Sequence, residues 1–263
     1  MATVKEVSAF LDSIAPCSMK MDFDNVGFLV GDGNKQVNKV LLALDITDEV
    51  IAEAVEYGAD LVVAHHPLMF SIKNASTDDM IGRKLVAMLG AGMAAICMHT
   101  NLDAVVGGVN DCLMNVLGVS SEGAIEPYGE DQNGLPYGMG RYGTVEKMPL
   151  TAFLRHCKDA LRCNGLRFVD AGKQVHRVAV CGGSGSSMLQ DVAALGCDTF
   201  VTADVKHNGF LDAKELGINL IDAGHYSTEN VVIPYLFERL AEQFPDFDMV
   251  ISRRHGQPEQ YFV

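Results

Sequence analysis

Basic residues are scarce in this chain of 263 residues, and no hydrophobic run is long enough to cross a membrane. The 20 lysines and arginines face 34 aspartates and glutamates, which gives a formal net charge of −14. Such a surface repels phosphate backbones and anionic lipids, so we expect neither a nucleic-acid partner nor a membrane partner. The longest uncharged apolar run, 85–98, has 14 residues, whereas a membrane-spanning helix needs about 20.

Cysteine pairs typical of zinc fingers or disulfide frameworks are also missing. The seven cysteines form no CxxC pair, and their odd number favours reduced thiols. The apolar residues of 4–14 recur at helical spacing, which predicts an amphipathic helix instead of a signal peptide. We therefore expect a cytoplasmic protein, and 48% hydrophobic residues are enough for a well-buried core.

Strands and helices alternate along the first half of the chain. Apolar runs at 40–45, 61–66 and 93–99 are typical of buried strands, and helical periodicity over 48–58 and 82–92 predicts the helices between them. Strands that are apolar throughout and joined by helices form mainly parallel sheets with helices on both faces. The sequence therefore predicts an α/β fold.

The second half repeats the pattern of the first. Residues 40–64 align without a gap on 178–202 at an offset of 138, and 99–103 align on 225–229 at an offset of 126. Strand lies over strand and helix over helix, although few residues are identical. We interpret this pattern as an internal duplication that gives two similar α/β units.

A segment of different composition separates the two units. Residues 120–140 are rich in glycine, proline and acidic residues, which predicts a loop or linker. A strand over 141–146, a helix over 150–163 and a strand over 166–172 follow it. We place the boundary near residue 125, with a first domain at 1–125 and a second at 126–263.

Histidines and carboxylates gather where the expected strands end, which is where open α/β sheets build their sites. Four of the eight histidines lie there: His65, His66, His99 and His225. Asp103 and Glu229 each follow one of these histidines by four residues, within or next to the first turn of a helix. Each such pair can converge on one point.

This donor set suits a divalent transition metal such as zinc, iron, manganese or nickel. Three histidines and two carboxylates exceed the usual needs of one catalytic ion, and they fit two ions about 3.5–4 Å apart if one carboxylate bridges. Two such ions activate a water molecule for hydrolysis. The alternative is a plain strand end, with His65 hydrogen-bonded in the core and His66 at the surface before a proline.

Several blocks resemble one known family. FDNVGFLVGD at 23–32, GADLVVAHHPLMF at 58–70, HTNLDAVVGGVND at 99–111, GGSG at 182–185 and DAGHYSTE at 222–229 run in the order of the GTP cyclohydrolase 1 type 2 homologues. These proteins are also described as Nif-three-like dinuclear metal-centre proteins. The blocks extend over nearly the whole chain.

The resemblance implies two similar α/β domains, a dinuclear metal site between the halves, and six chains assembled into a ring. It also implies a set of five metal ligands, two of them from the C-terminal part: His65, His66, Asp103, His225 and Glu229. Glu229 is the expected bridge. The resemblance places His99 beside the ions as a catalytic proton carrier or as an orienting residue.

Four further residues are candidates for substrate binding. Asp24 and Asn25 either cap a turn or reach the edge of the site, where the resemblance places them. Lys206 and His207 either bind an anionic substrate or form a solvated pair in a loop. The glycines and serines of 182–187 fit a phosphate contact or a serine-capped turn.

The leading hypothesis is a cytoplasmic hydrolase that depends on two divalent ions, such as zinc, iron or manganese. The family name suggests attack of activated water on the purine ring of GTP, so we expect a small, nucleotide-like substrate. A dinuclear phosphoesterase acting on a nucleotide or a phosphorylated metabolite is the alternative within enzymes. A non-catalytic metal-binding or scaffold hexamer is the alternative outside them.

Overall fold

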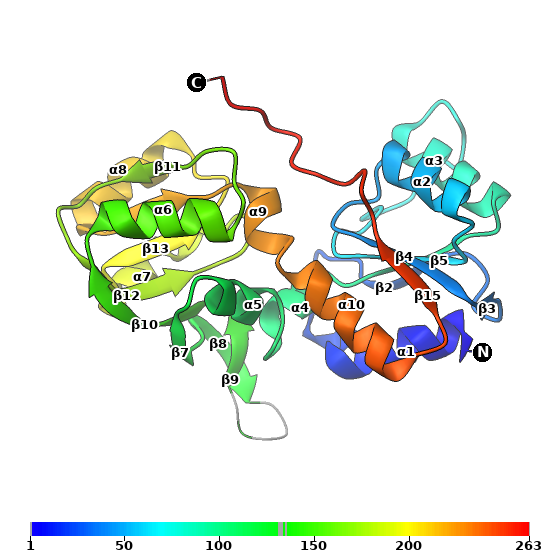
Figure 1. The fold of residues 1–263 in the computed structure, drawn as a ribbon, viewed down its shortest axis with the longest axis horizontal. Coiled ribbons are helices and arrows are strands. Elements are labelled where there is room, and N and C mark those ends of the chain that lie inside the picture. Colours follow the sequence, from blue (N-terminus) through cyan, green and yellow to red (C-terminus); the bar gives the residue numbers. More distant parts are fainter. Residues whose placement is uncertain (1, 131–133, 135, 263) are drawn as a thin grey trace. The chain divides into compact units, whose positions relative to one another are not determined.

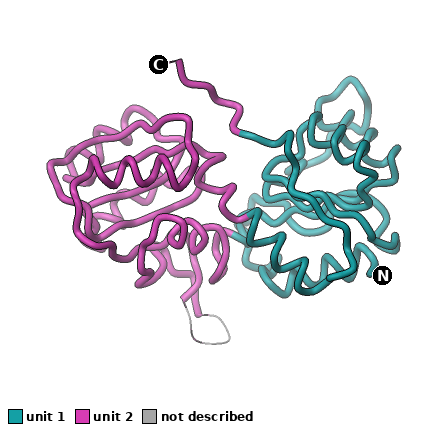
Figure 2. The backbone as a smooth tube through the Cα atoms, in the orientation of Figure 1, with its two compact units in different colours: residues 1–102, 233–256 teal, residues 103–232, 257–263 magenta. Residues whose placement is uncertain are grey.

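The computed structural model describes residues 2–130, 134 and 136–262, and it divides them into two compact units (Figures 1 and 2). Unit 1 contains Met1–Leu102 and Ile233–Gly256, and unit 2 contains Asp103–Val232 and Gln257–Val263. Among the described residues, no helix has the length and apolar character needed to cross a membrane.

The helices and strands of unit 1 begin with a capped helix. The hydroxyl of Thr3 accepts from the backbone of Glu6, whose carboxylate accepts in return from the backbone of Thr3, so the predicted N-terminal helix starts where this capping box lies. The elements of this unit are β1 (Ala2–Thr3), α1 (Val4–Ile14), η1 (Cys17–Met19), β2 (Gly27–Val30), β3 (Gln36–Val37), β4 (Lys39–Ala43), α2 (Asp48–Tyr57), β5 (Leu61–Ala64), α3 (Met80–Gly90), β6 (Ala94–Cys97), most of α10 (Val232–Gln243) and β15 (Asp248–Ile251). Helix α4 (Thr100–Ala104) contains the boundary between the two units.

The helices and strands of unit 2 include one long hairpin-like extension and a second α/β sheet. They are α5 (Val109–Val116), β7 (Ser120–Gly123), β8 (Glu126–Glu130), β9 (Pro136–Met139), β10 (Arg141–Met148), α6 (Leu150–Ala160), β11 (Arg167–Val169), β12 (Val175–Val180), η2 (Ser186–Met188), α7 (Leu189–Ala194), β13 (Thr199–Thr202), α8 (His207–Leu216), β14 (Asn219–Asp222) and α9 (His225–Glu229).

The main sheet of unit 1 has the order β15-β4-β5-β6-β2. Only β2 runs antiparallel to its neighbour. All residues of β5 and β6 are buried, which means that both faces of the sheet are covered. The sheet of unit 2 has the order β11-β14-β13-β12-β10-β7, and its parallel part is β12-β13-β14. The α/β prediction is therefore confirmed, with sheets that are mixed.

The same turn recurs in the two units. The carboxylate of Asp60 accepts hydrogen bonds from the backbone of Asn38 and Lys39, and the carboxylate of Asp198 accepts them from His176 and Arg177. These residues correspond at the offset of 138 found in the sequence. The two units thus share a local structure, and the internal duplication stays a prediction.

The segment 120–140, predicted as a loop or linker, contains strands, so this prediction is wrong. Strand β7 pairs with β10, and β8 pairs with β9, in both cases antiparallel. The side chains of β7 and β8 are mostly exposed, so these strands lack the apolar alternation that marks a strand in a sequence.

The division into units also differs from the boundary expected near residue 125. Leu113, Met114, Leu117 and Val119 belong to the hydrophobic core cluster of unit 2, which also contains Phe153. The chain then returns to unit 1, because β15 pairs in parallel with β4. Periodicity along the chain does not report such long-range pairing.

The glycine that ends α2 provides a test of the local backbone. Gly58 has a φ of +74°, whereas the φ of Gly90 lies outside the left-handed region. At both positions a Cβ would have no neighbouring atom within 4 Å. We expect Gly58→Ala to lower the free energy of unfolding by about 1 kcal/mol, because alanine is strained at this φ. Gly90→Ala, the matched control in α3, is expected to raise it by roughly 0.5 kcal/mol. Urea unfolding measures both, and equal changes would contradict the prediction.

Candidate metal centre

Three histidines meet at the carboxyl ends of β5 and β6. The strands are parallel neighbours, with Ala64 opposite Cys97, and their ladder continues through a hydrogen bond from Met98 N to Ala64 O. On the other side of β5, His66 N donates to Leu44 O, just after β4. The ring centroids lie 5.0 Å apart for His65 and His66, 5.3 Å for His65 and His99, and 5.4 Å for His66 and His99. One donor atom of each ring lies within 4.8 Å of the other two. Unit 1 therefore presents a compact group of three imidazoles.

Each of these rings is oriented by a hydrogen bond at Nδ1. The acceptors are Met98 O for His65 at 2.7 Å, Asp45 Oδ1 for His66 at 2.6 Å, and Asp24 Oδ1 for His99 at 2.9 Å. A neutral imidazole that donates from Nδ1 carries its lone pair on Nε2, which is the form that binds a metal. The three rings thus have the tautomer that a metal site requires.

Asp24 connects the loop of 21–25 to His99. Its carboxylate is buried and accepts from the backbone of Thr100 at 3.0 Å, from the hydroxyl of Thr100, and from the backbone of Asn25 at 2.7 Å. Burial acts to raise the pKa of Asp24, but the hydrogen bonds from Thr100 and His99 outweigh it and lower the pKa below its usual value. Asp24 therefore lies behind His99 as a charged partner, and its predicted contact with substrate remains a prediction.

Asn25 joins two loops of unit 1. Its side-chain amide donates to Met69 O at 2.8 Å, so the loop of 21–25 is held against the segment that follows His66. This contact occupies the side-chain amide of a residue that the sequence offers as a candidate for substrate binding. A role for Asn25 in substrate binding stays a prediction.

Unit 2 presents a second set of donors at the ends of β13 and β14. His225 begins α9, and its Nε2 lies 2.9 Å from Oε2 of Glu229 one turn later. Its Nδ1 donates to Oδ2 of Asp204 at 2.7 Å. A carboxylate oxygen of Asp103 lies within 4.8 Å of one of Glu229. The backbone oxygen of Asp103 accepts from the side chain of Asn110 at 3.0 Å.

A glycine of the GGSG block makes room for these donors. Gly183 has φ of +61°, and a Cβ added there would lie 2.2 Å from Oε1 of Glu229 and 3.1 Å from a ring carbon of His225. Only glycine is compatible with this approach. The block therefore has a steric reason for its composition, apart from the phosphate contact that the sequence also allowed.

Two orienting residues were not recognised in the sequence. Asp45 and Asp204 each follow a strand by a residue or two and each accept from a histidine Nδ1. Asp204 also has φ of +53°, an uncommon conformation for a residue other than glycine. The sequence did contain a signal for both residues, because each is a carboxylate at the end of a strand. At the offset of 138 between the two repeated segments, Asp204 also corresponds to His66.

Lys206 and His207 lie at the start of α8. Both are exposed, and Lys206 lines a pocket of about 330 Å³ in unit 2 together with Ser184, Asp204 and Asn208. The pocket walls carry hydroxyls, amides and carboxylates, so one lysine faces mixed charge. A role for Lys206 and His207 in substrate binding stays a prediction.

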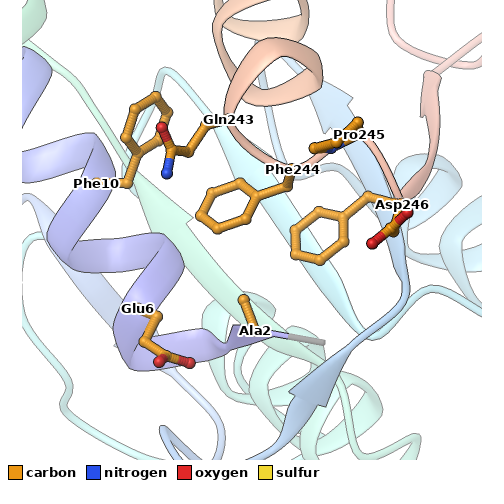
Figure 3. Close-up of a pocket in the computed structure, with 8 residues that line it drawn as sticks. Ala2, Glu6, Phe10, Gln243, Phe244, Pro245 and Asp246 are labelled. Carbon is orange, nitrogen blue, oxygen red and sulfur yellow. The ribbon is translucent and has the colours of Figure 1, made fainter.

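Another pocket of unit 1, of about 370 Å³, lies between α1 and the turn after α10 (Figure 3). It is lined by Ala2, Glu6, Phe10, Gln243, Phe244, Pro245, Asp246 and Phe247. None of the predicted site residues lines this pocket. The chemistry-bearing groups therefore lie at the strand ends and not in this pocket.

Together, the mixed α/β fold and the histidines and carboxylates at its strand ends define an α/β protein with a candidate metal centre. The family described as Duf34/NIF3 (NGG1p interacting factor 3) matches residues 2–258, and the chain belongs to this family. This finding confirms the resemblance seen in the sequence, since the curated relatives are named GTP cyclohydrolase 1 type 2 homologues.

One such relative, from Clostridium perfringens, is 33% identical over 262 residues, covering 98% of this chain and 99% of the relative. The structure of a Bacillus cereus protein related to NIF3 is 25% identical and superposes with a TM-score of 0.89 over 99% of both chains. A hypothetical protein from Staphylococcus aureus is 30% identical, with a TM-score of 0.89 and 99% of both chains covered. The chain is similar to these proteins along its full length.

The charge around His225 predicts a pH dependence of stability in the metal-free protein. Burial lowers the pKa of His225, but hydrogen bonds and charges from Glu229 and Asp204 outweigh it and raise the pKa to about 9. The pKa in the unfolded chain is about 6.5, so the folded state binds this proton more tightly. The stabilisation is complete below about pH 6.5 and is lost as the pH rises through about 9.

We expect the free energy of unfolding of the wild type, measured in chelator, to fall as the pH rises from 6.5 to 9.5. The same rise in pH is expected to leave a smaller loss in His225→Gln, which lacks this titrating group. Because the side chain is 33% exposed and water screens the charges, the expected difference is about 1 kcal/mol. Urea unfolding across this pH range provides the measurement. Parallel pH profiles of the two proteins would show that the prediction is wrong.

Proposed function

We propose that the protein is a hydrolase that depends on two divalent metal ions. The proposed ligands are His65, His66, Asp103, His225 and Glu229, with Glu229 as the bridge. Zinc, iron or manganese fit this mixture of nitrogen and oxygen donors. When bound, the ions would supply the Lewis acidity that activates water and polarises the bond under attack.

The observation that carries this proposal is shared by four histidines. His65, His66, His99 and His225 all use Nδ1 for a hydrogen bond to a carbonyl or carboxylate oxygen. Metal-binding histidines nearly always have such a partner, because it sets the tautomer and the ring orientation. His176 makes the same kind of bond to Val145 O, so the support for a metal centre lies in the combination of this pattern with the position of the four histidines at strand ends.

His99 and Asp24 are the proposed pair for proton transfer. With Asp24 holding the proton on Nδ1, His99 can accept and return a proton at Nε2, and the buried carboxylate stabilises the imidazolium that forms. The alternative role for His99 is that of a direct ligand, since its donor atom lies within 4.8 Å of those of His65 and His66.

The proposed substrate is a small, nucleotide-like molecule. The name of the curated relatives favours attack of water on the purine ring of GTP. A dinuclear phosphoesterase is the close alternative, because the same donors and ions also suit attack on a phosphoryl group. A non-catalytic metal-binding or scaffold protein is the alternative of a different class.

We place the protein in the cytoplasm and propose an assembly of six chains. The buried cysteines, such as Cys97 and Cys157, are free thiols, which fits a reducing compartment. The hexamer is proposed from the family resemblance alone. A sedimentation mass near that of one chain would contradict it.

The metal content of the purified protein tests the proposed ligands. Protein purified without chelator is expected to contain about two ions per chain, and Glu229→Ala is expected to lose most of them because the bridge is removed. Elemental analysis by mass spectrometry measures the content. His156→Ala is the control, since this ring donates to Leu117 O away from the proposed ligands.

Two further variants sharpen this test. Asp204→Asn is expected to weaken metal affinity 10- to 100-fold, because it weakens the partner of a ligating ring. His99→Ala is expected to keep both ions if His99 carries protons, and to lose one if it is a ligand. Wild-type protein that takes up no zinc, iron or manganese would contradict the proposal.

Turnover of candidate substrates tests the proposed reaction. We expect metal-dependent hydrolysis of GTP or of a simple phosphoester, lost in chelator and reduced at least 100-fold in His99→Ala. Chromatography of the products distinguishes ring opening from phosphate release. If metal is bound but neither substrate turns over, and metal instead controls association with a partner, the non-catalytic alternative replaces the hydrolase.

A further inference from the structure

Two phenylalanines of unit 1 are exposed beside the group of three histidines. Phe23 is 63% exposed and Phe70 is 57% exposed, although both are large apolar side chains. Their ring centroids lie 6.2 Å apart, and the ring of Phe70 lies 6.1 Å from that of His99. Exposed aromatic surface next to candidate catalytic groups is a feature of ligand sites.

Buried neighbours hold both rings in these exposed positions. Phe23 precedes Asp24, whose buried carboxylate binds His99 and Thr100. Phe70 follows Met69, which is 4% exposed and accepts a hydrogen bond from Asn25. The two loops are thus tied to each other and to His99. The exposure of the rings is therefore built into the fold and does not result from loose loop ends.

The geometry of the pair decides how a ligand can contact it. A separation of 6.2 Å with an interplanar angle of 49° already brings the two rings into contact, so no third ring fits between them. The pair forms an apolar wall, which we call the Phe23/Phe70 wall. A planar ring can stack only on its outer surface.

Three other aromatic residues of unit 1 pack against one another. The ring of Phe10 packs edge-on against that of Phe244, with centroids 5.5 Å apart (Figure 3). The ring of Phe244 also stacks on that of Phe247 at 4.8 Å. These three rings are only partly exposed. The Phe23/Phe70 wall differs from them because most of its surface faces solvent.

The Phe23/Phe70 wall borders a pocket that contains polar groups. Phe70 lines this pocket of about 310 Å³ together with Ser71, Lys73, Asp79 and Ile81. Oδ2 of Asp79 accepts from the backbone of Ile81 and Gly82 at the start of α3. Ser71 contributes a hydroxyl, and Lys73 contributes an ammonium group that can bind an anionic group. The volume is that of a small-molecule site.

We propose that the Phe23/Phe70 wall stacks on the planar heterocycle of the substrate, and that Lys73 binds the phosphate attached to it. This inference rests on the proposed function, whose donors begin at His99. It assigns Phe23, Phe70 and Lys73 as specificity-determining residues for a nucleotide-like molecule. The size of the pocket favours a small ligand over a second copy of the chain, and Lys73 supplies the local positive charge that a phosphate needs in a chain with a net charge of −14.

The absence of tryptophan from the chain makes a direct test possible. Phe70→Trp introduces a single indole, and excitation at long wavelength then reports on this position alone. Guanosine 5′-monophosphate is the probe, with ribose 5-phosphate as the control that lacks the base. Binding is measured in chelator, so that no turnover is needed, and circular dichroism verifies that the variant is folded.

We expect guanosine 5′-monophosphate to quench the indole with saturation and ribose 5-phosphate to leave it unchanged. Phe23→Ala in the same background is expected to weaken binding about tenfold, through loss of stacking. Phe168→Ala, at a ring of unit 2 that is 50% exposed, is the matched control and should leave affinity unchanged. Lys73→Met should weaken binding of the monophosphate and spare that of guanosine.

Three outcomes would overturn the inference. The first is an absence of quenching by the monophosphate in the folded variant. The second is emission that changes with protein concentration instead of with nucleotide, which would mean that a second copy covers the wall. The third is equal affinity of the wild type and Phe70→Ala for labelled monophosphate in equilibrium dialysis, a measurement that does not depend on the indole.

Failure of this inference can be told apart from failure of the proposed function. Nucleotide binding without metal-dependent turnover would contradict the hydrolase and leave the wall as a binding site. Turnover of GTP with an unchanged KM in Phe23→Ala and Phe70→Ala would support the proposed hydrolase activity and exclude the Phe23/Phe70 wall as a substrate-binding surface.

Discussion

Parallel pairing of β5 with β6 is the constraint on which the candidate site depends. In parallel strands the carboxyl ends lie at one edge of the sheet, so the residues after β5 and after β6 are brought together although about thirty positions separate them in the chain. His65, His66 and His99 meet for this reason. In unit 2 the parallel strands β13 and β14 do the same for Asp204 and His225. An antiparallel connection would place these residues at opposite edges.

The second feature common to the two units is the support behind each imidazole. Three aspartates and one backbone carbonyl accept from Nδ1 of the four histidines. Part of this support has a backbone cost, because Asp204 has a positive φ, a conformation that is uncommon for residues other than glycine. Folds keep such costs mainly at functional sites, where rigid orientation of the reacting groups is needed. The pattern favours a metal centre over four histidines with separate structural roles.

The chemistry of the donors limits the function without selecting the substrate. Imidazoles and carboxylates of this kind suit divalent metals and the activation of water, whether the target is a purine ring or a phosphoester. The exposed Phe23/Phe70 wall adds a preference that the donors lack, because aromatic surface recognises flat rings and not phosphoryl groups. In the proposed function the reaction class comes from the histidines and carboxylates, and the choice of molecule comes from the loops that surround them.

The sequence by itself determined the alternation of strands and helices, the α/β class and the positions of the histidines at strand ends, because these depend on periodicity and on neighbours along the chain. It did not reveal β7 and β8, whose side chains are mostly exposed, nor the return of β15 to the first sheet, which is a pairing between distant segments. Only the tertiary structure decided that Asp24 lies behind His99, that Asp45 and Asp204 orient His66 and His225, and that Phe23 lies beside Phe70. Each of these contacts joins residues from different loops, and the distance between loops is set by strand pairing and packing in three dimensions.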